Sequence, residues 1–191
     1  GSEMCIRDRL LDISLEAAGS ESVELANSVN RYKTAAYTIE RPLHLGAAIA
    51  GASEELIAAF RGYGHDIGIA YQLRDDQLGV FGDPAVTGKP AGDDLREGKR
   101  TELLALALQR ADESDPQAAA TLRKLIGHTS DPQELSRLAQ IIADSGAPEE
   151  IERRIDALTR SGLQHLHAAQ VDPAVTEALE QLAIKATARR K

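Results

Sequence analysis

Apolar residues recur three and four positions apart along most of the chain, which is the pattern that amphipathic α-helices produce. Residues 10–18 and 21–37 each follow this pattern, and Gly19 separates the two predicted helices. No segment alternates apolar and polar residues over a length typical of a β-strand. The pattern therefore predicts an all-α fold, in which buried helix faces pack against one another.

Two further helices follow before the middle of the chain. Pro42 can open the first, which we expect to run to about Gly51. Ser53 is a good N-cap for the second, which we expect to end near Phe81.

Three glycines lie inside this long helix, Gly62, Gly64 and Gly68. Each costs about 1 kcal/mol relative to alanine, so they predict that something approaches the backbone closely. Gly64 and Gly68 also extend the helix face that leads to Gln72 and the two aspartates, and this stripe of small residues predicts the wall of a cavity with a polar end.

Residues 82–98 are rich in glycine and proline and predict a long loop, whose length suggests a function. Within it, we expect Asp93 and Asp94 to order the loop or to cap a helix, and not to bind a metal ion.

The remainder of the chain predicts one helix after another. Asp115, Asp131 and Asp172 each precede a proline, which is the sequence of an N-cap followed by the first helical residue. Asp131 and Glu134 also have the spacing of a capping box. Gly146 should end one of these helices, and the next should begin at about Pro148.

Composition narrows the class of protein. The chain has 191 residues, 42% of them hydrophobic, which suits one folded domain or part of a larger helical one. Its net charge of −8 disfavours nucleic acid as a partner. No apolar run has the length of a membrane span, and the single cysteine, Cys5, allows no disulfide framework. A cytoplasmic location is the default expectation.

We expect residues 1–9 to be a non-native leader and 10–191 to form the folded part.

One group of polar residues has a spacing that points to chemistry. On a helix Gln72, Asp75, Asp76 and Gly79 share one face. Adjacent carboxylates repel each other unless a cation neutralises them, and oxygen ligands favour Mg²⁺, which proteins hold with one or two carboxylates plus phosphates. Taken alone, a pair of aspartates on a helix is more often solvated surface.

The loop that follows contributes cations suited to phosphate oxygens. Lys89 and Lys99 stand near its middle and its end, with Arg96 and Arg100 beside the latter. A Gly-Lys pair in a loop is by itself uninformative, and this one is not a phosphate-binding P-loop, because the motif ends in Pro90 where Ser or Thr is needed and no strand precedes it. Carboxylates for Mg²⁺ and lysines for phosphate, close together in the sequence, nevertheless predict a diphosphate site.

Two segments strengthen this prediction. YQLRDDQLGVFGDPAVTGKPAGDDLREGKRT, residues 71–101, resembles the second aspartate-rich region of the trans-isoprenyl diphosphate synthases, the family of farnesyl and geranylgeranyl diphosphate synthases. RYKTAAY, residues 31–37, is similar to the Lys-Thr motif of that family. It lies upstream of the aspartate-rich region, as the family pattern requires. The resemblance implies an isoprenoid synthase-type helical bundle, of which this chain would be the C-terminal portion.

The resemblance also implies an activity. In that family Mg²⁺ helps an allylic diphosphate to ionise, and the allylic cation then alkylates isopentenyl diphosphate to give a longer prenyl diphosphate. Asp75, with Asp76 beside it, would then bind Mg²⁺, whereas Lys33 and Lys89 would bind the allylic diphosphate and Lys99 would lie near it. Thr34 and Gln72 would stabilise the allylic cation with their oxygens. The family also implies a homodimer.

Two departures from the family pattern matter. Gly79 occupies the fifth position of the DDxxD motif, so its third carboxylate is missing. The first aspartate-rich motif is also missing, and the match weakens before Asp12. We therefore expect a fragment that is truncated at its N-terminus and has no chain-elongating activity by itself.

Alternatives to a synthase remain open. A non-catalytic or regulatory subunit of a heteromeric synthase is one of them, although such a subunit would not need to retain Lys33, Asp75 and Lys89. A terpene cyclase of the same helical fold is another, which the pattern of the 82–98 loop disfavours. The length of the product and the choice of allylic substrate are not determined by this sequence.

Overall fold

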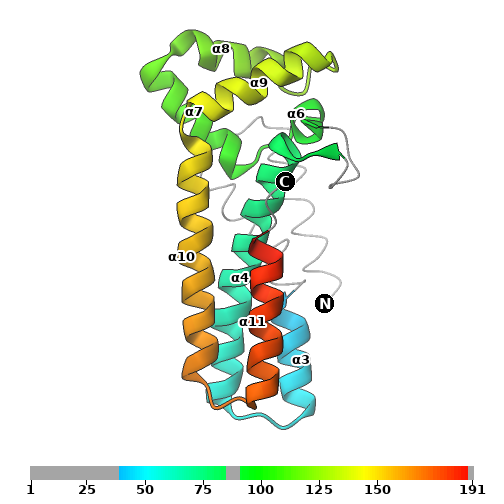
Figure 1. Ribbon diagram of the computed structural model, residues 1–191, viewed down its shortest axis with the longest axis vertical. Helices are drawn as coiled ribbons and strands as arrows, with labels where there is room; N and C mark the ends of the chain where they lie inside the picture. Colours follow the sequence, from blue (N-terminus) through cyan, green and yellow to red (C-terminus); the bar gives the residue numbers. More distant parts are fainter. Residues whose placement is uncertain (1–38, 85–90, 189–191) are drawn as a thin grey trace. The chain divides into compact units, whose positions relative to one another are not determined.

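Helices make up most of the computed structural model, which describes residues 39–84 and 91–188, and no strand occurs within these ranges (Figure 1). The all-α prediction is thereby confirmed for the described residues. The helices predicted at 10–18 and 21–37 lie outside them. The helices are α3 (Arg41–Ile49), α4 (Glu54–Phe81), α6 (Asp93–Glu97), α7 (Glu102–Ser114), α8 (Pro116–Leu125), α9 (Pro132–Asp144), α10 (Ala147–Ala168) and α11 (Pro173–Thr187).

The predicted starts of the helices are largely correct. The Ser53 hydroxyl accepts a hydrogen bond from the backbone N–H of Leu56 at 3.3 Å and so caps α4. Side chains of Asp115, Asp131 and Asp172 accept from the first turns of α8, α9 and α11 in the same way. These caps act within a few residues of each helix start, so short stretches of sequence are enough to find them.

The capping box predicted for α9 is wrong in its second half. Glu134 does not bond the backbone of Asp131, because its carboxylate accepts a hydrogen bond from the Thr129 hydroxyl. Thr129 also accepts the Asp131 N–H, at 3.1 Å, and so takes the place that Glu134 was expected to fill.

The prediction of an unbroken loop over 82–98 is wrong for its last part, where α6 forms. Glycines flank this short helix on both sides, and both are in the left-handed conformation, with φ of 72° at Gly92 and 73° at Gly98. Asp93 and Asp94 occupy its first turn, where the partial positive charge of the helix N-terminus favours carboxylates. A helix this short has too few residues to show a periodic pattern.

The chain divides into two compact units. The first includes 75–152, and thus the end of α4, helices α6 to α9, and the start of α10. In it α7 packs against α8, α8 against α9, and α6 against α9. Apolar side chains that are almost completely buried fill this unit: Leu95, Leu103, Leu108, Leu122, Leu138, Ile142 and Ile151.

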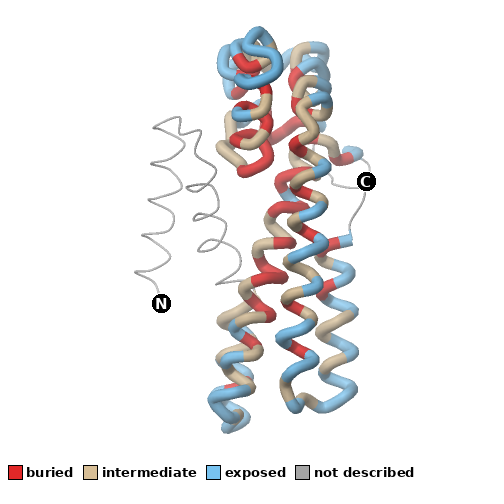
Figure 2. Tube along the Cα trace, turned by 90° about the vertical axis from the view of Figure 1, so that its left-hand side faces the viewer, coloured by how far each residue is buried: buried red, intermediate tan, exposed pale blue. Residues whose placement is uncertain are grey.

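The second unit includes the described residues 39–74 and 153–188, in which α3, most of α4, most of α10 and α11 run alongside one another (Figure 1). One apolar core joins these four helices, and its buried members are Ala47, Phe60, Tyr63, Ile67, Leu166 and Ala183. Along α10 and α11, buried positions recur between exposed ones (Figure 2). This periodicity is what the apolar spacing in the sequence predicts.

Polar contacts also join helices of the second unit. The Tyr63 hydroxyl donates to the backbone carbonyl of Leu179 on α11 at 2.8 Å, and burial raises the pKa of Tyr63 to about 12. About three turns further along α4, the Arg74 guanidinium donates to the carbonyl of Thr187 at 2.8 Å. Among the described helices, none combines the length and the apolar character that crossing a membrane requires.

Candidate functional site

The polar group predicted on α4 lies at the C-terminal end of that helix. Gln72, Asp75, Asp76 and Gly79 all fall inside Glu54–Phe81, so the helical spacing on which their shared face depends is confirmed. Their surroundings differ, however. Asp75 is exposed, Gln72 is half-buried, and Asp76 is buried with a relative exposure of 4%. Asp75 is therefore the carboxylate that a cation from solvent can reach directly.

Gly79 lies one turn beyond the two aspartates and is in close contact with α6. A Cβ atom placed on Gly79 would lie 2.0 Å from the Oδ2 atom of Asp94 and 2.3 Å from its Cγ atom. Both separations are far shorter than any non-bonded contact, so only glycine fits at this position without a shift of the Asp94 side chain. The sequence predicts close approaches at Gly62, Gly64 and Gly68 and not at Gly79, so this contact is found only in the structure.

Gly64 and Gly62 are further close approaches on the same helix. A Cβ on Gly64 would meet the Cα of Glu40 at 2.8 Å, and one on Gly62 would meet the ring of His165 at 2.6 Å. The interpretation of Gly64 as part of a cavity wall is therefore wrong, because the backbone at Glu40 fills that space. Sequence periodicity placed these glycines on the helix but could not identify what packs against them.

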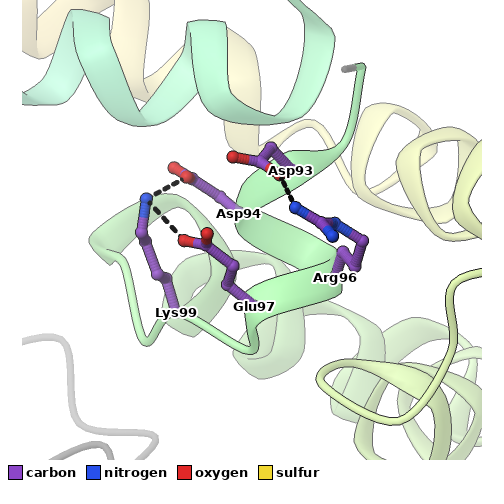
Figure 3. Close-up of polar contacts among 5 residues, drawn as sticks. All are labelled: Asp93, Asp94, Arg96, Glu97 and Lys99. Atoms are coloured by element: carbon purple, nitrogen blue, oxygen red, sulfur yellow. Dashed lines mark hydrogen bonds and ion pairs between the residues drawn. The ribbon is translucent and has the colours of Figure 1, made fainter. Parts of the chain in front are cut away.

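Lys99, at the end of the loop, forms ion pairs with two carboxylates of α6 (Figure 3). Its ammonium contacts Asp94 Oδ1, and it lies 3.3 Å from Glu97 Oε2. Burial lowers the pKa of Lys99, but the hydrogen bonds and charges of Asp94 and Glu97 together raise it above its ordinary value. Lys99 therefore stays protonated over the whole neutral range.

Asp93 and Arg96 form the other ion pair of α6 (Figure 3). Both Asp93 and Asp94 are buried, with relative exposures of 8% and 6%, and each has a cationic partner. Burial of a carboxylate is tolerable when it is paired and hydrogen-bonded, as both are here. This agrees with the expectation that these aspartates order the loop.

Three of the residues implied by the family resemblance lie outside the described residues: Lys33, Thr34 and Lys89. The structure places Gln72, Asp75 and Asp76 on α4, and it separately places Lys99 against Asp94. Asp94 was not predicted to be part of the site. The signal that could have indicated its role is the glycine at 79, because a side chain at that position would clash with the Asp94 carboxylate.

The described residues allow a test of whether Mg²⁺ fits this part of the chain. Across 39–84 and 91–188, no group of three or more histidine, cysteine, aspartate or glutamate side chains lies close enough together to enclose a metal ion. Mg²⁺ in proteins is commonly held by one or two carboxylates, with phosphates and waters completing its octahedron. The exposed carboxylate of Asp75, beside Asp76, fits this second type of site.

Comparison with known proteins gives a consistent result. The family model of the polyprenyl synthetases matches residues 4–144. Over 91 residues the chain is 47% identical to the geranylfarnesyl diphosphate synthase of Aeropyrum pernix, and these residues make up 47% of this chain and 28% of that protein.

Solved structures extend the similarity over nearly the whole chain. A geranylgeranyl pyrophosphate synthase from Corynebacterium glutamicum, in complex with isoprenyl diphosphate and magnesium, is 60% identical over 98% of this chain, with a TM-score of 0.95. A geranylgeranyl pyrophosphate synthase from Bacteroides thetaiotaomicron is 30% identical over 98% of this chain, with a TM-score of 0.82. The chain spans only 52% of the first of these proteins and 60% of the second.

Proposed function

The chain belongs to the polyprenyl synthetase family, and we propose that it is part of a Mg²⁺-dependent prenyltransferase that condenses isopentenyl diphosphate with an allylic diphosphate. The observation that carries the proposal is the exposed Asp75 beside buried Asp76 at the end of α4, in a chain that the family model matches over 4–144. The similar Corynebacterium protein, in complex with isoprenyl diphosphate and magnesium, supports the substrate class. Because the chain spans 52% of that protein, the activity is proposed for the protein as a whole.

In the proposed site, one set of groups neutralises the charge of the diphosphate leaving group and another set binds the allylic diphosphate. Mg²⁺ at Asp75 would neutralise the developing charge on the diphosphate leaving group. Lys99 is positively charged at neutral pH, like other lysines, and its raised pKa favours that form further, so it can contribute to the same electrostatic field without a proton transfer. Asp94 and Glu97 hold that ammonium in place. Lys33 and Lys89 are proposed to bind the allylic diphosphate.

Gln72 is proposed to face the hydrocarbon end of the substrate. It is half-buried and lies one helical turn before Asp75 on α4. Its amide oxygen, together with the hydroxyl oxygen of Thr34, would present partial negative charge to the allylic cation. A fixed dipole is suited to this task because it needs no reorganisation when the cation forms.

The first experiment is to sequence the genomic DNA upstream of the codon for Leu10, and then to express the longest open reading frame that contains this chain. Its purified product should convert isopentenyl diphosphate and farnesyl diphosphate into longer prenyl diphosphates, and it should lose this activity when EDTA removes Mg²⁺. We expect the 191-residue chain by itself to be inactive, because the first aspartate-rich motif is absent from it.

Asp75→Asn tests the assigned metal ligand. Because a neutral amide binds Mg²⁺ poorly, kcat/KM of the expressed enzyme should fall at least about 100-fold. Asp144→Asn on α9 is the control, since Asp144 is exposed and takes part in no proposed step. An expressed protein that binds Mg²⁺ and inorganic diphosphate, but transfers no prenyl group from any allylic substrate, would instead support the alternative of a non-catalytic subunit. Equal activity of wild type and Asp75→Asn would contradict the proposal.

A further inference from the structure

Gly79 stands where a third carboxylate would complete the aspartate-rich motif of α4, and the structure has a carboxylate beside that position. The Oδ2 atom of Asp94 lies 2.0 Å from the place that a Cβ on Gly79 would occupy. In an aspartate at 79, the carboxyl carbon would be one bond, about 1.5 Å, beyond that Cβ. The Asp94 carboxylate therefore occupies the space in which the missing side chain would lie.

Asp94 is held firmly in this place. It is 6% exposed and lies in the first turn of α6, between two glycines in the left-handed conformation. Its backbone carbonyl accepts a hydrogen bond from the N–H of Lys99 at 3.0 Å, while its Oδ1 atom contacts the Lys99 ammonium. Since both its backbone and its carboxylate are engaged, Asp94 cannot turn away freely to make room for a larger residue at 79.

The two carboxylate oxygens of Asp94 thus have different neighbours. Oδ1 is paired with Lys99, and Oδ2 is directed at the backbone of α4, one turn beyond Asp75 and Asp76. A glycine at 79 allows this approach without a clash, and any side chain there would require the Asp94 carboxylate to shift. The contact between Gly79 and Asp94 therefore bears on where the Lys99 ammonium lies, because that ammonium contacts Oδ1 of the same carboxylate.

We propose that Asp94 supplies, from α6, the carboxylate that α4 lacks at Gly79, and that it acts as a positioning residue for Lys99 in diphosphate binding. The contact between Gly79 and Asp94 is independent of any ligand, whereas the effect on diphosphate rests on the proposed function. Two measurements separate these parts, both made on the protein encoded by the longest open reading frame that contains this chain.

The first measurement is a double-mutant cycle of thermal stability without ligand, using Gly79→Asp, Asp94→Ala and the double variant. Gly79→Asp should lower the unfolding midpoint, because its side chain collides with Asp94 and adds a second carboxylate to a confined space. Asp94→Ala should lower it too, because Lys99 loses one of its two carboxylate partners and retains only Glu97. In the double variant the carboxylate is on α4 and not on α6, and the clash is removed. Its unfolding midpoint should therefore fall by clearly less than the sum of the decreases in the two single variants. Additive losses would overturn the proposed contact.

The second measurement is calorimetric titration with inorganic diphosphate in the presence of Mg²⁺. Asp94→Asn keeps the shape of the side chain but removes its charge, so we expect about tenfold weaker binding, as for other residues that orient a ligand group. Asp93→Asn is the matched control, because Asp93 is equally buried and pairs with Arg96 instead of Lys99. The double variant Gly79→Asp/Asp94→Ala should bind more tightly than Asp94→Ala alone.

The outcomes distinguish this inference from the proposed function. Equal weakening by Asp93→Asn and Asp94→Asn, or no weakening by either, would overturn the role of Asp94 while leaving diphosphate binding intact. A wild-type chain that binds no diphosphate would overturn the proposed function and this role together. The stability cycle would still decide whether Asp94 takes the place of a side chain at 79.

Discussion

At the scale of single residues, identical residue types have different consequences that depend on their neighbours. Gly46 on α3 has no atom within 4 Å of the place that a Cβ would occupy, whereas a Cβ on Gly64 of α4 would lie 2.8 Å from the Cα of Glu40. Both are helical glycines, so the gain in helix propensity from alanine is the same at the two sites. What differs is the space that the methyl group would need.

Gly46→Ala and Gly64→Ala therefore have opposite expected effects. Gly46→Ala should raise the free energy of unfolding by about 0.5–1 kcal/mol, because it removes only the entropic cost of glycine. Gly64→Ala should lower it by about 1–3 kcal/mol, because backbone cannot move as a flexible side chain can. Urea unfolding followed by circular dichroism measures both. A stabilising Gly64→Ala would show that Glu40 does not pack there.

Tyr63 gives a prediction about pH. Its folded-state pKa of about 12 lies above the ordinary value of 10.0, so folding favours the neutral phenol. The stability that this contributes is fully present below pH about 10 and is lost as pH rises towards 12, because the unfolded state releases the proton first. Tyr63→Phe should reduce this alkaline loss, and at neutral pH it should cost about 1 kcal/mol for the bond to Leu179. Urea unfolding from pH 7 to 11 tests both. If Tyr63→Phe lost stability with rising pH as steeply as the wild type, Tyr63 would not be the cause of the alkaline loss.

At the scale of elements, the helix ends of the C-terminal half are set by a few side chains close to each end. On α9, Asp131 at the N-cap accepts the N–H of Gln133 at 3.1 Å, while Asp144 is the last helical residue. A carboxylate is favoured at the first position and disfavoured at the second by the partial charges of the helix termini. Asp144 does accept a bond from the Gln140 amide, at 2.8 Å, on the exposed surface.

Alanine substitutions at the two ends of α9 should therefore differ. Asp131→Ala should lower the free energy of unfolding by about 1 kcal/mol, because an N-cap is lost. Asp144→Ala should change it by less than about 0.5 kcal/mol, because an exposed bond and an unfavourable end charge are removed together. Thermal unfolding of both variants measures the difference. Equal losses would mean that the Asp131 cap contributes nothing specific.

At the scale of the whole molecule, large apolar side chains remain exposed on α3 and α11. Ile49, on α3, has a relative exposure of 86%, and Leu182, on α11, has one of 59%. By contrast, Ile67 of the same unit is 1% exposed. Exposed apolar surface promotes association between molecules without contributing to the folded core.

Ile49→Lys should consequently separate solubility from stability. We expect less light scattering at high protein concentration and a change in unfolding free energy within about 0.5 kcal/mol. Ile67→Ala is the contrasting variant, since truncation of a buried isoleucine costs about 2–5 kcal/mol. If Ile49→Lys destabilised the chain as strongly as Ile67→Ala, Ile49 would have to be buried in solution.

Features that depend on residues close together in the chain could be predicted from the sequence alone. The bounds of α3 and α4, the aspartate caps at 115, 131 and 172, and the position of Asp75 and Asp76 on one helix all follow from spacings of a few residues. Such signals act through local backbone bonds and helix periodicity, which tertiary packing leaves in place.

The packing of helices was needed to establish which distant residues meet. It placed Asp94 against Gly79 and Glu40 against Gly64. It buried Asp76 while leaving Asp75 exposed, and it directed Lys99 to Asp94. In the sequence, the glycine at 79 is only a missing carboxylate. The folded chain shows the reason for it, because the space available to a side chain depends on a helix that local spacing cannot position.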